Sequence, residues 1–284
     1  MLSALVISLT RITPLSILDA IVLGVVEGIT EFLPISSTGH LLVTQHLLGL
    51  GDEAGKVASD TYAIAIQLGA ILAVFALYRM RIASMAKGVI GKDAEGRSIL
   101  TMVVCAFLPA AVIGVAFGDS IKDKLFTPWA IVAAWAAGGV FLLWWKPAYG
   151  TRNIYDITLK SAFIIGVAQA LAMWPGVSRS LITIVAALLV GCSMAAALEF
   201  SFLLGLATLT AATALDLAKN GDVLLDAYGW GTPILGAVVA FITAIIAVKW
   251  LVSYLSARPL ARFGWYRLAA AAVTAVLIMS NTIG

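Results

Sequence analysis

The segment EGITEFLPISSTGH, residues 27–40, puts two carboxylates, four hydroxyls and an imidazole into an otherwise apolar part of the chain. Glu27 and Glu31 are spaced i, i+4, so a helix would place both carboxylates on one face. Two carboxylates so close repel each other unless a cation or a proton lies between them. Hard divalent ions take oxygen ligands and commonly link a carboxylate to a substrate phosphate. The pair therefore predicts a binding site for Mg²⁺ or Ca²⁺.

The residues after this pair are suited to phosphate. Pro34 interrupts the helix, and the backbone N–H groups that follow are then available to an anion. The hydroxyls of Ser36, Ser37 and Thr38 can cap the returning helix and donate hydrogen bonds to phosphate. His40 opens that helix and could serve as nucleophile or as general acid and base. A serine nucleophile would need an activating base, which His40 could itself be, so both assignments stay open.

A second polar segment, WPGVSRS at residues 174–180, interrupts another apolar run. Ser178 and Ser180 supply hydroxyl donors, and Arg179 supplies a guanidinium. A charged side chain inside a membrane costs about 2.5–3.5 kcal/mol even on the lenient insertion scale, so Arg179 needs an anionic partner. Its planar fork matches a phosphate in two-donor geometry, which a lysine would not reproduce. The two segments together predict a site for a phosphate attached to an apolar group.

The composition identifies the class of protein that carries these segments. Of the 284 residues, 62% are hydrophobic and 12% are charged, which is too little polar surface for a soluble domain. The formal net charge of +3 is too small and too scattered for a nucleic-acid footprint, so no nucleic-acid partner is expected. The sequence predicts an all-α, polytopic membrane protein.

Apolar runs of two kinds follow along the chain. Six are long enough to cross a bilayer, at about 62–78, 98–118, 128–145, 199–217, 232–252 and 265–283. Two others are broken by glycine, proline and serine into halves at 17–33 with 40–50, and at 159–174 with 181–192. Such broken runs can enter and leave on the same side if the tip is buried in protein. We expect both to form re-entrant helical hairpins.

The order of these runs predicts an internal repeat. A hairpin followed by three spans occurs twice, in residues 15–145 and 146–284, within one membrane domain of residues 1–284. Aligning the chain from Gly24 with the chain from Gly166 needs no gap and pairs Glu27 with Gln169. Three spans are an odd number, so the second repeat starts on the opposite side and the repeats are inverted. Inverted repeats of this kind bring their broken helices together near the midplane.

The basic residues predict the orientation. Twelve Lys and Arg residues in the supposed loops, Arg267 among them, fall on one side, and five fall on the other. The richer side is expected to be cytoplasmic, which places the first hairpin on the outer face. Arg179 is then the one basic residue left inside the membrane.

Two of these motifs resemble a known family. EGITE, from Glu27, is similar to the (E/Q)xxxE motif of the undecaprenyl-diphosphatase family, also called the bacitracin-resistance proteins. PGVSRSLIT, residues 175–183, resembles the PGxSRSxxT motif of that family and ends at Thr183. The segments FLPISSTGH and EFSFLLGLATLTAATALDL are also family-like, and the resemblance covers nearly the whole chain.

The resemblance implies an enzyme of the bacterial plasma membrane that hydrolyses undecaprenyl diphosphate, the cell-wall lipid carrier, at a metal-dependent site open to the outer face. It implies that Glu27 and Glu31 hold the metal or position water, and that His40 is nucleophile or acid and base. Phosphate-binding residues implied by the resemblance or by the motifs are Ser36, Ser37, Thr38, Ser178, Arg179, Ser180 and Thr183. The expected partners are the polyprenyl diphosphate and membrane lipid, and a homodimer is one open oligomeric state.

One alternative of another class is a transporter or flippase that binds a phosphorylated lipid without hydrolysing it, because inverted repeats are also a transporter plan. Some other polar residues have a simpler explanation as helix ends, interfacial groups or interhelical contacts. They are Asp19, His46, Gln67, Glu199 and Asp216.

Overall fold

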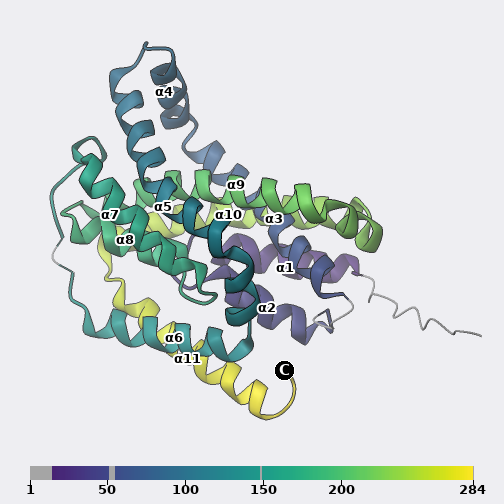
Figure 1. Ribbon diagram of the computed structural model, residues 1–284. Coiled ribbons are helices and arrows are strands. Elements are labelled where there is room, and N and C mark those ends of the chain that lie inside the picture. Colours follow the sequence, from purple (N-terminus) through teal and green to yellow (C-terminus); the bar gives the residue numbers. More distant parts are fainter. Residues whose placement is uncertain (1–14, 51–54, 148, 284) are drawn as a thin grey trace, which may run out of the picture.

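A computed structural model describes residues 15–50, 55–147 and 149–283, and most of these residues are helical. The helices before the midpoint are α1 (Ile17–Thr30), α2 (Ser37–Leu47), α3 (Lys56–Leu77), α4 (Arg79–Val89), α5 (Ala94–Leu125) and α6 (Pro128–Trp144). Those after it are α7 (Leu159–Gln169), α8 (Arg179–Leu189), α9 (Met194–Tyr228), α10 (Gly231–Ala257) and α11 (Ala261–Met279). Two short 3-10 helices lie at Ile154–Asp156 and Ala170–Met173. Figure 1 shows how these elements are arranged.

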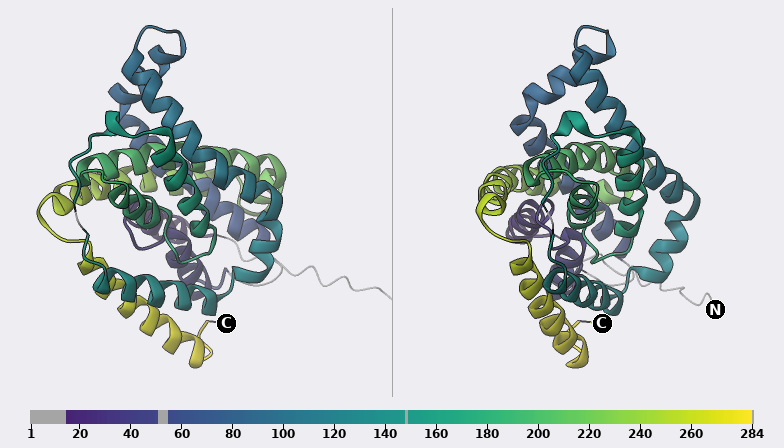
Figure 2. Two further views of the ribbon diagram at one scale, coloured as in Figure 1. Left: turned by 60° about the vertical axis from the view of Figure 1, so that its left-hand side comes forward. Right: turned by 90° about the vertical axis from the view of Figure 1, so that its left-hand side faces the viewer.

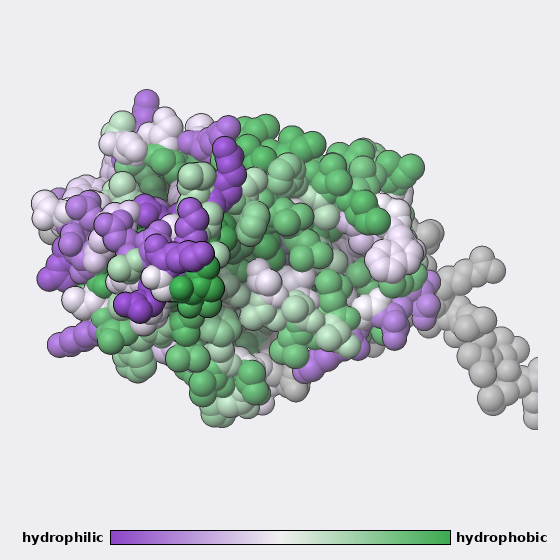
Figure 3. Space-filling view, turned by 90° about the horizontal axis from the view of Figure 1, so that it is seen from above, coloured by the Kyte–Doolittle hydropathy of each residue, from purple (hydrophilic) through white to green (hydrophobic). Residues whose placement is uncertain are grey.

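The predicted polytopic membrane fold is confirmed. Five helices are long and apolar enough to cross a bilayer, namely α3, α5 within Ala94–Gly118, α9, α10 and α11. The sixth predicted span is α6, whose 17 apolar residues fall just below that length. Apolar side chains cover much of the face in Figure 3, whereas hydrophilic ones gather toward the end that carries α4.

The basic segment after α3 is a helix and not the loop that the orientation count assumed. α4 packs against the start of α5, and the two project from the body as a helical hairpin (Figures 1 and 2). Asp93 holds its turn, because its carboxylate accepts from the Gly96 N–H at 2.8 Å and from the Ser84 hydroxyl at 2.6 Å. α4 was not predicted from the sequence, because its apolar content is too low for a membrane-spanning helix.

Both predicted breaks are present, and α1 packs against α2 as α7 packs against α8. The residue before each returning helix has the same unusual backbone, with φ 73°, ψ 103° at Ser36 and φ 73°, ψ 110° at Ser178. These serines occupy equivalent places in the gapless alignment. A positive φ is costly for a residue with a side chain and persists only where the surroundings hold it.

The spans enclose the two hairpins. α1 packs against α10, and α7 packs against α5, so each hairpin rests on the middle span of the other predicted repeat. α3 packs against α9, and α6 lies beside α11 in every view (Figures 1 and 2). Two structurally related repeats that pack against each other would show this reciprocal pattern of contacts. The repeat boundaries at 15–145 and 146–284 remain a prediction.

Candidate active site

The tips of the two hairpins touch each other. The Ser180 hydroxyl donates to the Leu33 carbonyl at 2.9 Å, and the Ser178 hydroxyl lies 3.5 Å from the same oxygen. The two hydroxyls are also 3.1 Å apart. All three residues are buried. Residues about 145 positions apart in the chain therefore form one polar cluster, as the sequence led us to expect.

A buried ion pair joins the same tips. Arg179 Nη2 donates to Glu31 Oε1 at 2.8 Å, and the two side chains are only 11% and 5% exposed. The Ser37 hydroxyl donates to the other carboxylate oxygen of Glu31. Glu31 thus has one partner from each tip. Removing one member of a buried pair leaves an uncompensated charge and costs about 3–5 kcal/mol.

The surroundings of Arg179 fix its guanidinium from other sides. Nη1 donates to the Ser201 carbonyl at 3.2 Å, and the guanidinium carbon lies 5.2 Å from the centre of the Phe32 ring. A Cβ at Gly205 would come within 2.1 Å of Nη1, so only a glycine leaves room for this arrangement. Thr183 donates to the Arg179 carbonyl at 2.9 Å and lies 2.6 Å from the Ser201 hydroxyl, which ties α8 to α9.

Glu27 differs from Glu31, because it is fully buried and neither carboxylate oxygen has a hydrogen-bond partner among the described residues. A buried carboxylate without partners is costly unless a cation or a proton accompanies it. Its two hard oxygens therefore fit Mg²⁺ or Ca²⁺. Within the described part of the chain, no three His, Cys, Asp or Glu residues cluster as a metal site. Further ligands would have to come from water or substrate.

His40 lies at the same tip with both ring nitrogens engaged. Nδ1 is 2.7 Å from the Ser36 carbonyl, and Nε2 is 2.7 Å from the Tyr266 hydroxyl. The Trp135 ring packs against the imidazole at a centroid distance of 4.7 Å. Among the described residues, the side-chain hydrogen bonds of Glu31 and Ser37 go to each other and to Arg179, and those of the His40 ring go elsewhere. Thr38 is half-buried beside this group.

Arg267 corrects the sequence interpretation. It was counted as a loop residue, yet it is 0% exposed within α11. Nη2 donates to the carbonyls of Ala134 at 2.9 Å and Gly176 at 2.8 Å, and Nη1 donates to the Pro34 carbonyl at 3.4 Å. Arg179 is therefore not the one buried arginine. Removing Arg267 from the twelve leaves eleven basic residues against five.

The sequence contained a signal for this residue that was not used. Arg267 lies inside the predicted span at 265–283, and a cation inside a span is more often functional or structural than part of a loop. A Cβ at Gly138 on α6 would come within 2.4 Å of Arg267 Nη2, so this glycine opens the space. Tyr266 and Trp135 carried no comparable sequence signal, because an aromatic residue in a span is common.

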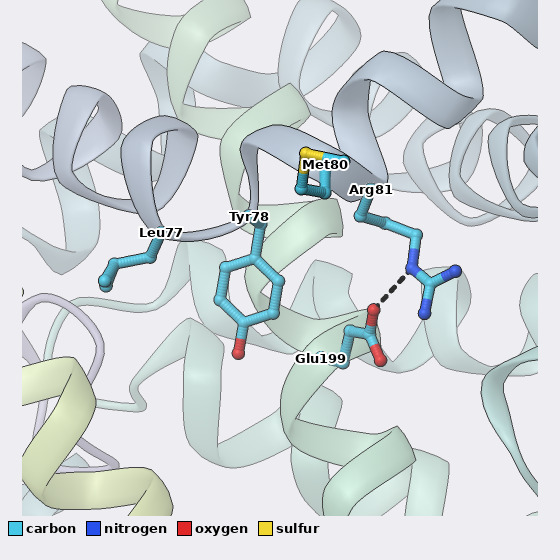
Figure 4. A pocket seen from close by; sticks show the side chains of 5 residues that line it. All are labelled: Leu77, Tyr78, Met80, Arg81 and Glu199. Carbon is cyan, nitrogen blue, oxygen red and sulfur yellow. Dashed lines mark hydrogen bonds and ion pairs between the residues drawn. The ribbon is translucent and has the colours of Figure 1, made fainter.

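The other polar residues lie outside this cluster or have local partners. Asp19 forms a capping box with Ser16 at the start of α1, and His46 Nδ1 contacts the Leu42 carbonyl at 2.9 Å. Glu199 pairs with Arg81 at 2.6 Å beside a separate pocket of about 330 Å³ (Figure 4). Two further hydrogen bonds join Thr213 to Gln67 at 3.5 Å and Asn220 to Asp216 at 3.2 Å.

These observations define a polytopic, all-helical membrane protein whose polar centre is built by two broken helices. The family model described as "Bacitracin resistance protein BacA" matches residues 20–273. The chain belongs to this family.

Named relatives agree with this assignment. The chain is 44% identical over 262 residues to an undecaprenyl-diphosphatase of Sorangium cellulosum, covering 90% of this chain and 84% of the relative. It is 42% identical over 259 residues to an undecaprenyl-diphosphatase of Dechloromonas aromatica, covering 90% and 92%. It is 41% identical over 266 residues to an undecaprenyl-diphosphatase of Acinetobacter baumannii, covering 93% and 96%.

We expect Arg267→Met to destabilise the protein by about 2 kcal/mol or more, because the buried carbonyls of Pro34 and Gly176 lose their side-chain donor at once and each unpaired group costs about 1–3 kcal/mol. Thermal unfolding in detergent would measure the loss. Arg262→Met, which changes an exposed arginine of the same helix, is the matched control. An equal unfolding midpoint for both variants would contradict the role given to Arg267.

Proposed function

We propose that this protein hydrolyses undecaprenyl diphosphate to undecaprenyl phosphate and inorganic phosphate. Membership of the BacA family and the names of the relatives support this reaction. The observation that carries it is the buried arrangement of Arg179, Glu31 and Ser37, in which a guanidinium, a group suited to phosphate, contacts a carboxylate that also accepts from a hydroxyl. A transport function without hydrolysis has no comparable support.

Arg179 has the geometry to bind the terminal phosphate. A guanidinium binds phosphate oxygens through two donors, as it binds carboxylates. In our proposal the phosphate takes over the Nη2 donor that now points to Glu31. The carboxylate of Glu31 then loses its cationic partner and becomes a stronger base beside the hydroxyl that already donates to it.

This contact supports Ser37 as the nucleophile. The sequence left the nucleophile open between His40 and a serine because a serine needs an activating base. In our proposal Glu31, which accepts a hydrogen bond from the Ser37 hydroxyl, is that base. The Ser37 oxygen would bond to the terminal phosphorus while its proton goes to Glu31. The bond from phosphorus to the bridging oxygen breaks, and that oxygen leaves with the electron pair as undecaprenyl phosphate. Water then hydrolyses the phosphoserine and releases inorganic phosphate.

Glu27 would hold the divalent cation, because its two buried oxygens lack other partners. Mg²⁺ or Ca²⁺ supplies charge neutralisation for a diphosphate when it is bound. The tip hydroxyls of Ser36, Thr38, Ser178, Ser180 and Thr183 keep their predicted role near the phosphate. Those of Ser178, Ser180 and Thr183 also hold the two tips and α9 together.

The proposed setting is the bacterial plasma membrane, with the site open to the outer face. Eleven basic residues lie on the side proposed to be cytoplasmic and five on the outer side, and this excess supports the orientation. The substrate carries a polyprenyl chain, which the apolar surface of the spans suits. A homodimer remains a proposal that the oligomeric state in detergent would test.

The metal assignment predicts that a chelator stops phosphate release from undecaprenyl diphosphate in detergent, and that added Mg²⁺ or Ca²⁺ restores it. Glu27→Gln should lose most of the activity and the response to added metal, because one carboxylate oxygen becomes an amide. Glu95→Gln, on the exposed hairpin, should behave as wild type. Full activity in the presence of chelator would refute the metal and leave the hydrolysis standing.

The phosphate role of Arg179 predicts that Arg179→Lys lowers hydrolysis by roughly two to three powers of ten, because a lysine keeps the charge but loses the two-donor fork. Arg81→Lys makes the same change in the distant ion pair with Glu199 and is the control. Initial rates of phosphate release would measure both variants. Near-normal hydrolysis by correctly folded Arg179→Lys protein would exclude a two-donor contact with the substrate.

The orientation predicts which engineered cysteines an impermeant thiol reagent reaches from outside. Asp222→Cys, near the end of α9, should react in intact cells, and Lys92→Cys, in the hairpin of α4 and α5, should react only after lysis. Both positions are exposed. The native Cys105 and Cys192 would first be replaced to remove background. The reverse labelling pattern would invert the assignment.

A further inference from the structure

Tyr266 forms a hydrogen bond with His40 that has no role in the reaction proposed above. The Tyr266 hydroxyl lies 2.7 Å from His40 Nε2, and the two rings stack with centroids 5.7 Å apart at an angle of 16°. Tyr266 comes from α11, 226 positions away in the sequence. Tyr266 is 46% exposed, whereas the tip serines Ser36 and Ser37 are buried.

The hydrogen bonds fix which nitrogen of His40 carries the proton. A carbonyl only accepts, so Nδ1, at 2.7 Å from the Ser36 carbonyl, must be the protonated nitrogen of a neutral imidazole. Nε2 then carries the lone pair and accepts the hydrogen bond from the Tyr266 hydroxyl. A partner on one ring nitrogen sets the tautomer at the other, which is how hydrogen bonds orient functional histidines.

The second hairpin serves as an internal comparison. Ser178 has nearly the same φ and ψ as Ser36, and the residue equivalent to His40 is Ile182. At Ser178 the backbone N–H of Ile182 reaches the serine carbonyl at 3.2 Å without help from any ring. The left-handed tip therefore folds without an imidazole. The backbone of the first tip therefore does not need the two hydrogen bonds that hold the His40 ring.

We propose that Tyr266 is a positioning residue that acts through His40. The Ser36 carbonyl sets the tautomer, and the Tyr266 hydroxyl holds Nε2 of the same ring, which keeps the Nδ1–H on that carbonyl. Ser36 directly precedes Ser37, whose hydroxyl donates to Glu31. The order Tyr266, His40, Ser36, Ser37 thus connects α11 to the reacting hydroxyl. This inference rests on the proposed hydrolysis.

Two readouts test it on the full-length protein. The chain has two histidines, so ¹⁵N-histidine labelling gives one resonance pair for His40 and one for His46. In Tyr266→Phe, which keeps the ring and removes the hydroxyl, the Nε2 resonance of His40 should shift while that of His46 stays in place. The kcat for phosphate release should fall about threefold to tenfold at a nearly constant KM, the effect of losing one hydrogen bond that orients a group in the site.

Tyr254→Phe is the matched control, because Tyr254 stacks on Trp250 away from His40. It should change neither the resonance nor kcat. The proposal is overturned if the His40 resonance is the same in Tyr266→Phe and wild type, or if kcat is unchanged. A fall in kcat that follows only a lower unfolding temperature would also overturn it, since that result indicates a structural role alone. A wild-type protein that releases no phosphate would instead refute the proposed function, and the resonance would still report the hydrogen bond.

Discussion

The guanidinium of Arg267 is the constraint on which the arrangement of the two tips depends. It is fully buried and donates to the carbonyls of Pro34 and Gly176, which are equivalent positions of the two hairpins. It also donates to Ala134 on α6. Carbonyls freed where a helix breaks inside a membrane protein need donors from the protein. One side chain supplies donors to both breaks, so the hairpins cannot shift independently of each other or of α6 and α11.

The second buried arginine, Arg179, pairs with a carboxylate and not with backbone carbonyls alone. Arg179 is balanced by Glu31, so its charge is neutralised inside the protein, and this pair lies between the tips that Arg267 holds. Electrostatic interactions are stronger in such surroundings than in water, and fixed donors need no reorganisation when a substrate arrives. Glu27 adds a carboxylate without a protein partner among the described residues. The centre therefore combines one paired carboxylate with one unpaired carboxylate, which suits the proposed binding of a cation together with an anionic substrate.

The two hairpins share a backbone and differ in chemistry. Ser36 and Ser178 have almost the same dihedral angles, yet the position after them is Ser37 in one hairpin and Arg179 in the other. Glu27 corresponds to Gln169, and His40 corresponds to Ile182. The first hairpin provides the carboxylates, the hydroxyl of Ser37 and the imidazole, and the second provides the guanidinium. Neither half holds a complete set, which is why the contact between tips matters more than the geometry of either one.

The sequence by itself determined the all-helical membrane fold, five of the spans, both helix breaks and the residue types of the polar centre. These features are local, because hydropathy over about 20 residues and the positions of Pro, Gly and Ser are properties of a single segment. The tertiary structure decided which partner each side chain takes. Arg267 lies inside a predicted span, but its carbonyl partners are defined only when α11 packs on α6 and the two tips meet. Tyr266 is an ordinary aromatic residue until it contacts His40, and α4 is too polar to be recognised as a membrane helix. Each of these outcomes depends on packing between elements, which no local pattern of residues encodes.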